Sequence, residues 1–559
     1  MSKITARYWQ GPVNDQSDFP ENGDPELTYQ AIQNRPNCGI AFSGGGTVSA
    51  ALAPGFIKAL EDLKLMKNVR YISGVSGGTW GTAAYCYALD VNHREKYFGT
   101  KINPDISQLN AEEIEKSDED GSMLKAVTDA LIGELTVANM ALGHEAFTRA
   151  VGQIFLKPFD LDNTSGYFSC DDNSIGNIKG RNQNLNDTAF LKLFKNENNQ
   201  DESSPYYIMN GTLLTPPRVP EGGSYKVFPF EFTPLYCGTI GNQGPDSSGE
   251  TIGGYFVEPF GFNTFAPTAD VTEKTVTADE ADKPLILSSP VGTSGSAIED
   301  AIAQEQNVLK DLTAYLPAFN YWNPADYEPG VPLLTQNYLF GDGGISEDTG
   351  LASLLARKVE NIVLFITEPF DVNAISDKTC EIEQRHYGFN QIARLFGAPV
   401  YVKVEGSNPP EYQLESSYDA FQQFFKTEDF KGLEMKLSEA KANNAPIVVT
   451  DAYDLVANQR FGVEDGWEVT ITWVVVDTCL AFNEGLAHGD IYDSEKGKFK
   501  IPGLENFPAI CTFEQNGPAP LNPLIQLTPA QANLLANQAY WMIGTSDAGK
   551  AVITQALNP

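Results

Sequence analysis

Short apolar runs and longer helical patterns alternate along this chain. The first run, Gly39–Phe42, leads through a glycine loop into an Ala/Leu-rich helical pattern that extends to about Leu65, and a second apolar run follows near Val69–Ile72. A strand, a helix and a second strand in this order are typical of a parallel βαβ unit. Since both strands of such a unit point the same way, we expect the loops that follow them to lie at one edge of a parallel sheet.

Three later runs have the composition of strands. Tyr206–Leu213 is apolar and rich in β-forming residues, and Tyr225–Thr233 is similar but contains Pro229, which favours a sheet edge or a bend. Residues 337–367 have the pattern of a strand, a glycine turn, a helix and a strand. The last part, Asn361–Thr367, is apolar almost throughout, which is typical of a parallel strand buried on both faces.

Further elements are predicted in the insertions and in the C-terminal third. Near the C-terminus, Thr528 and Pro529 have the residue types of a helix cap and a first helical position. The other predicted helices are Ser122–Ala150, Ser296–Leu316, 416–426 and 429–442, and the other predicted strands are Pro446–Thr450 and Trp467–Val476.

Together these elements predict an α/β fold with a mostly parallel central sheet, helices on both faces, helical insertions and a mixed C-terminal part. Residues 1–36 are polar and rich in Asn, Asp and Pro, so we expect an extended N-terminal arm over the surface. The remainder, 37–559, is expected to be a single catalytic domain. Its predicted insertions lie at about 91–205 and 265–330, and a cap or mixed region is predicted at about 371–445.

The stretch Gly74-Val75-Ser76-Gly77-Gly78 has the form G-x-S-x-G at a strand-to-helix turn. In a nucleophile elbow this turn exposes a strained serine, and glycines stand beside it because no Cβ fits there. Backbone N–H groups of the earlier glycine loop, Ser43-Gly44-Gly45-Gly46, could then face the oxyanion that forms when the serine attacks an ester.

Each of these motifs also has a simpler interpretation. The loop at Ser43–Gly46 could be an ordinary helix-leading turn, although it lacks the Gly-Lys-Ser/Thr of a P-loop and the spacing of G-x-G-x-x-G. Ser76 could be a serine in a tight turn, and Asp342 of Asp342-Gly343-Gly344 could belong to a common Asp-Gly turn. Glu347 and Asp348 match no EF-hand spacing and are better explained as acids at a helix N-terminus.

Composition narrows the class of protein. The 559 residues have a formal net charge of −35, which disfavours nucleic acid and anionic membranes as partners. No apolar run approaches the length of a membrane span, and Met1–Gln10 lacks a secretory apolar segment, so a cytoplasmic location is expected. The seven cysteines lack C-x-x-C spacing and favour reduced thiols, and Cys38 and Cys86, near the site, have the character of small buried hydrophobes.

In its motifs the chain resembles the cytosolic phospholipase A2 and patatin-like acyl hydrolases. The resemblance lies in the ordered set of glycine loop, G-x-S-x-G turn and Asp342-Gly343-Gly344, together with Phe230-Glu231-Phe232-Thr233-Pro234 and the terminal Leu-Thr-Pro segment. It implies that Ser76 is the nucleophile and Asp342 its base. It also implies that the Gly44 and Gly45 amides form the oxyanion hole, with Gly46 as a third donor, and that Gly74, Gly77 and Gly78 shape the elbow.

The resemblance further implies a lipid acyl hydrolase of the phospholipase or lysophospholipase kind, acting through an acyl-enzyme with no metal and no cofactor. Its substrate would be a lipid or another ester, met at a membrane or micelle surface. One departure is that Val48 stands where the phospholipase branch carries an arginine for the substrate phosphate. Arg70 or Arg218 could supply that charge, so the ester chemistry is predicted and the headgroup is left open.

Three alternatives follow from the same residues. A transacylase would use an acceptor other than water. An esterase with a Ser-Asp-His triad would use His386 or His488, both of which follow Asp342 in the α/β-hydrolase order. The third alternative is a catalytically silent lipid-binding relative.

Overall fold

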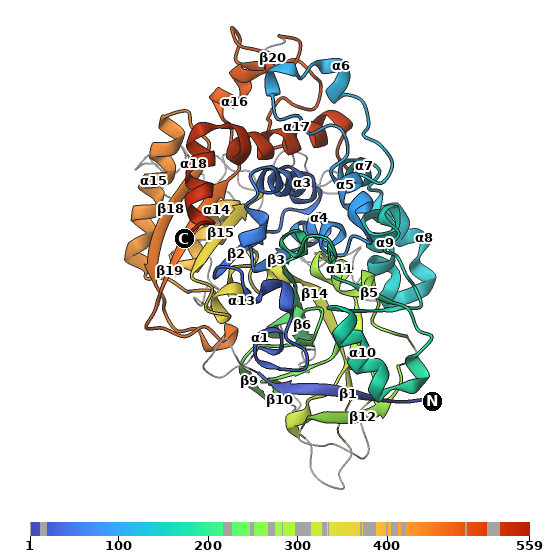
Figure 1. Cartoon of the computed structure of the whole chain (residues 1–559). Helices are drawn as coiled ribbons and strands as arrows, with labels where there is room; N and C mark the ends of the chain where they lie inside the picture. Colours follow the sequence, from blue (N-terminus) through green and yellow to red (C-terminus); the bar gives the residue numbers. More distant parts are fainter. Residues whose placement is uncertain are drawn as a thin grey trace.

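Helices surround a sheet that runs through the whole computed structural model of the chain (Figure 1). Among the described residues this sheet contains 13 strands, and its main path is β12-β1-β11-β8-β7-β6-β3-β2-β15-β19-β18. The structure describes residues 2–11, 19–215, 226–245, 251–265, 274–281, 283–296, 315–326, 333, 335–368, 372, 387–398, 401–403, 412–414, 421–486, 489–510 and 526–559.

The core of the sheet is parallel. Its five strands, in spatial order, are β6 (Tyr206–Thr215), β3 (Tyr71–Val75), β2 (Cys38–Phe42), β15 (Asn361–Ile366) and β19 (Glu468–Val475). β2 and β3 are buried at every position, and β15 at every position but its first, as expected for strands covered on both faces. The predicted α/β class with a mostly parallel core is confirmed.

Antiparallel strands extend this core. β18 (Ile447–Asp454) pairs with β19, and β7 (Lys226–Phe232) pairs with β6. β7 is not an edge strand, but β8 (Cys237–Gly238) pairs with its last two residues only, and Pro229 lies beyond that contact, opposite Thr212 of β6. Pro229 therefore displaces no ladder hydrogen bond toward β8.

The ends of β3 and β14 (Gln336–Asp342) meet along one edge of β6. β3 pairs with β6 as far as Asn210, and β14 pairs antiparallel with it from Gly211 onward, with Asp342 opposite Gly211. Because β7 pairs with β6 across both segments, β3 and β14 must share the other edge. The residue that follows β3 and the last residue of β14 are therefore brought to the same level of the sheet.

The helices that flank this meeting point are short or apolar. α3 (Gly46–Asp62) packs against α4 (Gly77–Cys86) and α17 (Pro529–Tyr540), and α13 (Leu351–Ala356) follows the Asp342 turn (Figure 1). The predicted cap of α17 is confirmed, because Thr528 and Gln531 form a capping box. The other described α-helices are α1 (Pro20–Gly23), α2 (Gln30–Gln33), α5 (Val91–Phe98), α6 (Ala111–Ile114), α10 (Asp172–Arg181), α11 (Ser288–Ser294), α14 (Tyr387–Leu395), α16 (Leu480–Gly485) and α18 (Asp547–Ala556).

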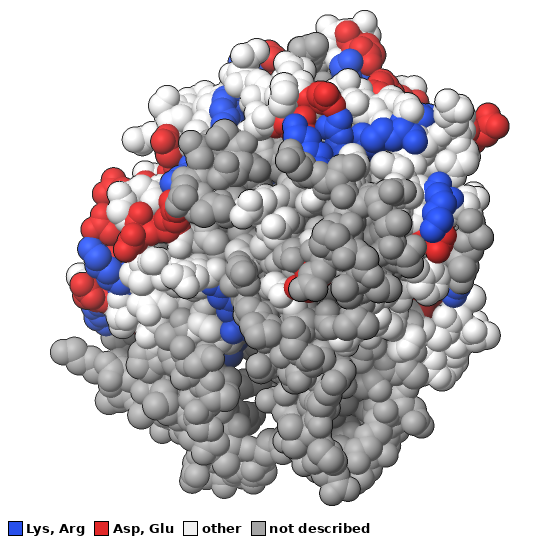
Figure 2. All heavy atoms as spheres, turned by 90° about the horizontal axis from the view of Figure 1, so that it is seen from below, with Lys and Arg blue, Asp and Glu red and all other residues white. Residues whose placement is uncertain are grey.

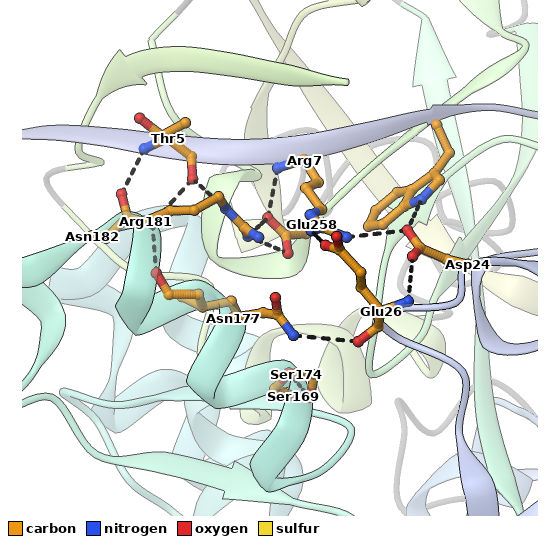
Figure 3. Close-up of polar contacts among 12 residues, drawn as sticks. Thr5, Arg7, Asp24, Glu26, Ser169, Ser174, Asn177, Arg181, Asn182 and Glu258 are labelled. Carbon is orange, nitrogen blue, oxygen red and sulfur yellow. Dashed lines mark hydrogen bonds and ion pairs between the residues drawn. The ribbon is translucent and has the colours of Figure 1, made fainter. Parts of the chain in front are cut away.

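The N-terminal segment differs from the expected surface arm. β1 (Lys3–Gln10) joins the main sheet between β11 (Tyr255–Val257) and β12 (Thr275–Asp279). Polar side chains fix it there: Arg181 and Asn182, at the end of α10, bond to the Thr5 backbone, as Figure 3 shows. Alternating buried positions along β1 explain why a polar composition still forms a strand.

The predicted helix Ser122–Ala150 is helical in kind but is interrupted. It divides into α7 (Met123–Thr128), α8 (Ile132–Ala138), a 3₁₀ segment at Met140–Glu145 and α9 (Ala146–Phe155). Gly143 has a φ of +58°, which ends the helical path there. The periodicity indicates the apolar face of these helices, and Gly143 explains the break before α9.

The remaining helix predictions have mixed outcomes. The prediction at 429–442 is confirmed by α15 (Phe430–Ala442). The prediction at 416–426 is wrong for residues 421–426, which form turns and an isolated bridge, and its first part lies outside the described residues. Most of Ser296–Leu316 also lies outside them, and the described helix of that region, α11, ends just before it.

Charges of both signs cover the exterior. On the described part of the face in Figure 2, acidic and basic side chains lie beside one another. Among the surface pairs, Lys192 lies 2.6 Å from Asp172 and Lys426 lies 2.6 Å from Asp454. Acids outnumber bases, 73 to 38, so such pairs leave a large negative excess. No helix among the described residues is both long and apolar enough to cross a bilayer.

Candidate active site

Ser76 lies in a strained turn between β3 and α4. Its φ of +50° and ψ of −124° fall in a region that non-glycine residues rarely adopt. Its N–H donates to Ser294 at the end of α11, at 3.0 Å to the carbonyl and 3.1 Å to Oγ. The turn therefore has the geometry expected of a nucleophile elbow, with the strain held by a neighbouring helix.

Ser76 and Asp342 are joined by a hydrogen bond. Ser76 Oγ donates to Asp342 Oδ2 at 2.8 Å, across 266 residues of sequence. The Gly344 N–H donates to the other carboxylate oxygen, Oδ1, at 2.8 Å. Ser76 and Asp342 are 7% and 4% exposed, so this bond is shielded from most water. The carboxylate is thereby oriented with one oxygen toward the hydroxyl.

Glycines allow the loops of the site to touch. A Cβ on Gly77 would lie 1.9 Å from the carbonyl oxygen of Gly46, and one on Gly78 would lie 2.5 Å from that of Phe42. A Cβ on Gly74 would lie 2.9 Å from Thr79 Oγ1. The predicted elbow glycines are thus explained by contact with the glycine loop and with the first turn of α4.

The amides of the glycine loop are not equivalent. The Gly44 N–H donates to the carbonyl oxygen of Asp348 at 2.9 Å. In the described part of the chain no acceptor faces the Gly45 or Gly46 N–H. Gly45, at φ +129°, has a conformation that favours glycine. The Gly44 amide is thus already paired with a backbone carbonyl, and the oxyanion-hole role expected of these glycines stays a prediction.

Thr367 anchors the glycine loop to the end of β15. Its N–H donates to Ser43 Oγ at 3.0 Å, and its Oγ1 lies 3.0 Å from the Gly44 carbonyl and 2.8 Å from Ser49 Oγ. Thr367 is fully buried. The sequence analysis included Thr367 in a strand but assigned it no role at the site. A threonine at the end of a buried strand beside a glycine loop is the signal that could have identified it.

α11 supports the elbow from the other side. Ser294 Oγ lies 2.8 Å from Thr79 Oγ1, and Trp80 Nε1 donates to the Val291 carbonyl at 3.2 Å. A Cβ on Gly295 would lie 2.3 Å from the Trp80 ring. No sequence pattern predicts this helix, because α11 is only seven residues long and contains Pro290 and Gly292.

The structure describes some of the other residues singled out from the sequence. Val48 is buried in α3, and Arg70 precedes β3, at the opposite end of that strand from Ser76, where it donates to the Arg35 carbonyl. Burial raises the pKa of the Cys38 thiol to about 12 and raises that of Cys86 further. Arg218, His386 and His488 lie outside the described residues.

Glu347 has the capping role expected of an acid at a helix N-terminus. Its carboxylate is buried and accepts from the N–H groups of Thr349 at 2.6 Å and Ala352 at 3.1 Å, at the start of α13. Burial raises the pKa of Glu347, and the bonds from this helix terminus act against that rise. Glu347 therefore supports the helix that follows the Asp342 turn.

The chain is similar in part to known phospholipases. The yeast Saccharomyces cerevisiae (strain ATCC 204508 / S288c) protein named "Putative meiotic phospholipase SPO1" is 41% identical over 51 residues, 9% of this chain and 8% of that protein. Human GIVD cytosolic phospholipase A2 aligns at 12% identity with a TM-score of 0.46, covering 94% of this chain and 64% of that one. Its complex with methyl gamma-linolenyl fluorophosphonate aligns at 14% identity with a TM-score of 0.39, covering 94% and 60%. The chain thus spans less than two thirds of these relatives.

A family comparison covers much more of the chain. The family described as "Patatin-like phospholipase" matches residues 40–355. That range contains the glycine loop, the Ser76 turn and Asp342, and it is more than half of the 559 residues. The protein is therefore a member of the patatin-like phospholipase family.

Proposed function

We propose that this protein hydrolyses the carboxylic esters of lipids, with Ser76 as nucleophile and Asp342 as its base. The observation that carries the proposal is the 2.8 Å hydrogen bond from Ser76 Oγ to Asp342 Oδ2 at a strained strand-to-helix turn. A hydroxyl held against a carboxylate in this geometry is the arrangement of an activated nucleophile.

In the first step Ser76 Oγ attacks the acyl carbonyl carbon while its proton passes to Asp342 Oδ2. The carbonyl oxygen becomes an oxyanion, for which the Gly45 and Gly46 N–H groups, unpaired within the described part of the chain, are suitable donors. The N-terminus of α4, directly after Ser76, adds a favourable field of about 0.3–2 kcal/mol. When the tetrahedral intermediate collapses, the proton returns to the departing alcohol and an acyl-enzyme remains.

In the second step water attacks the acyl-enzyme. Asp342 takes a proton from the water, the oxyanion forms again, and collapse releases the fatty acid and restores the Ser76 hydroxyl. An aspartate has an ordinary pKa of about 3.9, which makes it a weak base in water. Burial of Asp342 and the fixed direction of its Oδ2 favour the transfer, because proton transfer is fastest between groups already within hydrogen-bond distance.

A fluorophosphonate probe tests the proposal. We expect covalent labelling at Ser76, with both labelling and ester turnover abolished in Ser76→Ala. Asp342→Asn, which keeps the shape of the side chain, is expected to lower kcat by more than about 10²-fold. His386→Ala and His488→Ala serve as controls and should retain turnover. Labelling that persists in Ser76→Ala would remove the assignment, and an equal loss in a histidine variant would favour the triad.

We also propose that the substrate is met at a neutral lipid surface. The observation behind this is a group of exposed apolar side chains on α8 and the segment after it, among them Val137 at 66% and Met140 at 40% exposure. α8 packs on α9, and α9 packs on the α11 helix that holds Ser76. Since the chain carries a net charge of −35, apolar insertion is a better source of attraction than charge.

Phosphatidylcholine vesicles test this surface. Val137→Asp combined with Met140→Asp should reduce vesicle binding and turnover of vesicle lipid about 10-fold, while turnover of a soluble short-chain ester stays unchanged. Met435→Asp is the matched control, since Met435 is equally exposed, at 64%, but lies on α15 at the other side of the molecule (Figure 1). Equal losses in the control and the test variant would refute the proposed surface.

A further inference from the structure

The Asp348 side chain lies between the two loops that form the site. A Cβ on Gly44 would be 2.1 Å from Asp348 Oδ1, and a Cβ on Gly344 would be 2.5 Å from the same oxygen. The Asp348 carbonyl oxygen accepts the Gly44 N–H at 2.9 Å. Asp348 therefore contacts the glycine loop through both its backbone and its carboxylate, and the Asp342 turn through its carboxylate.

A helix from a distant part of the chain holds this carboxylate. Gln391 of α14 is buried, and its Nε2 donates to Asp348 Oδ2 and, at 3.2 Å, to Glu368 Oε2. Glu368 in turn follows β15 and lies beside Gly45, whose Cβ would be 3.6 Å from the Glu368 N. One amide group of Gln391 thus connects two acids that flank the glycine loop.

We propose that Asp348 is a positioning residue, which sets the separation between the glycine loop and the Asp342 turn, and that Gln391 fixes it in place. This inference rests on the proposed function of Ser76 and Asp342. The Gly344 N–H holds Asp342, and the glycine loop provides the Gly45 and Gly46 amides, so a spacer between Gly44 and Gly344 determines how far apart base and oxyanion donors lie.

Catalysis is sensitive to such a spacing. Displacement of reacting groups by about 1 Å can cost about 10²-fold in rate. The Asp348 carboxylate touches Gly44 and Gly344 only because neither carries a side chain, so the two glycines and the acid form one packed unit. Substitution of the acid should change the chemical step and leave substrate binding nearly intact.

The first test separates kcat from KM. Asp348→Ala is expected to lower kcat by about 10- to 100-fold with KM within about threefold, and Gln391→Ala by a smaller factor. Asp348→Asn, which keeps the shape of the spacer, should stay within about fivefold of the wild-type kcat. The thermal midpoint and fluorophosphonate labelling of Ser76 show that each variant is folded. A wild-type kcat in Asp348→Ala, or equal losses in Ala and Asn variants, would overturn the inference.

The second test is a double-mutant cycle with Gly44→Ala. Gly44 has no positive φ, so alanine is strained there by the Asp348 carboxylate and not by the backbone. Gly44→Ala should therefore lower kcat strongly in the wild-type chain. When Asp348 is also alanine, the same substitution should lower kcat by a factor about 10-fold smaller. The same cost in both backgrounds would refute the spacer role. Activity in Ser76→Ala would instead refute the proposed function itself, so the two failures are distinguishable.

Discussion

Two of the buried carboxylates in this molecule, in different regions of the sheet, are held in different ways. At the antiparallel end, Glu258 is 3% exposed and takes two bonds of 2.6 Å from Arg181 Nη2 and one of 2.6 Å from the Arg7 N–H (Figure 3). At the parallel core, Asp342 is 4% exposed and accepts from the Ser76 hydroxyl and the Gly344 N–H. One acid faces a guanidinium and the other faces a hydroxyl that can react.

A second charged cluster follows the pattern of Glu258. Arg357, fully buried at the end of α13, donates to Glu21 of α1 at 2.9 Å and to Glu231 of β7 at 2.8 and 3.1 Å. Burial raises the pKa of Glu21, and Arg357 opposes this rise. These guanidinium-held acids tie distant segments together. From this difference we predict that the arginine-held acids stabilise the fold, whereas the hydroxyl-held acid serves the proposed chemistry.

The strongest test of this comparison removes the guanidinium of Arg357. Arg357→Ala leaves Glu21 and Glu231 buried without their cation, so the free energy of unfolding should fall by about 3–5 kcal/mol. Urea denaturation followed by circular dichroism measures the loss. Lys358→Ala, next in sequence but at the surface, is the control and should cost less than about 1 kcal/mol. If Arg357→Ala lowers the free energy of unfolding no more than the control does, the ion pairs of Arg357 with Glu21 and Glu231 do not hold α1 and β7 together.

A paired substitution at the two acids is expected to have the next largest effect. Asp342→Asn should lower kcat more than about 10²-fold and leave the melting temperature almost unchanged, because the hydrogen-bonding shape is preserved. Glu258→Gln should do the opposite, lowering the free energy of unfolding by about 1–3 kcal/mol while kcat stays near the wild-type value. Steady-state kinetics and thermal melts on both proteins check the pair. If both Asp342→Asn and Glu258→Gln lose rate and stability together, the two acids do not differ in role.

The smallest expected effect concerns Glu368, an acid beside the glycine loop. Burial raises the pKa of Glu368 to about 8 from an ordinary value of 4.5. Between these values the folded chain keeps a proton that the unfolded chain has lost, so this residue lowers the free energy of unfolding as pH rises from about 4.5 to 8. Glu368→Gln should remove that slope and make the variant more stable at pH 8 by about 1–3 kcal/mol, but not at pH 4.5.

Urea denaturation of wild type and Glu368→Gln at several pH values measures this difference. Glu428→Gln is a suitable control, because Glu428 is an exposed acid of the same type. Parallel stability curves for wild type and Glu368→Gln across the window would contradict the raised pKa. Glu368 also extends the comparison of buried acids, because its hydrogen bond comes from the Gln391 side-chain amide and not from a guanidinium or a hydroxyl.

Much of the fold could be predicted from short-range sequence patterns. The strands β2 and β15 stand out because buried parallel strands are nearly continuous apolar runs, β3 and β19 because they are short and rich in β-forming residues, and the turn at Ser76 because close approach demands glycine. The hydrogen bond between Ser76 and Asp342 was expected from the resemblance to a family with that pairing. The register of the sheet could not be predicted from the sequence. This register aligns the ends of β3 and β14 along β6.

The parts that escaped prediction depend on contacts between distant residues. The roles of Ser294, Thr367 and Asp348 depend on partners that lie on other elements, and only Thr367 has a local signal for its role, its place at the end of a buried strand. The Gly44 amide is paired because the chain after Asp342 brings the Asp348 carbonyl to it. The N-terminal arm became a strand because β11 and β12 supply partners for it, which its polar composition did not reveal.

The head-to-head meeting of β3 and β14 along β6 has a consequence for how the protein acquires activity. Ser76 and its partner carboxylate enter the sheet from segments 266 residues apart, so no N-terminal fragment shorter than 342 residues contains both. During synthesis or refolding, helices and the first βαβ unit can form early, whereas the proposed site must wait for the long-range pairing of β14 with β6. The proposed ester turnover is thus expected to report that β14 has joined β6.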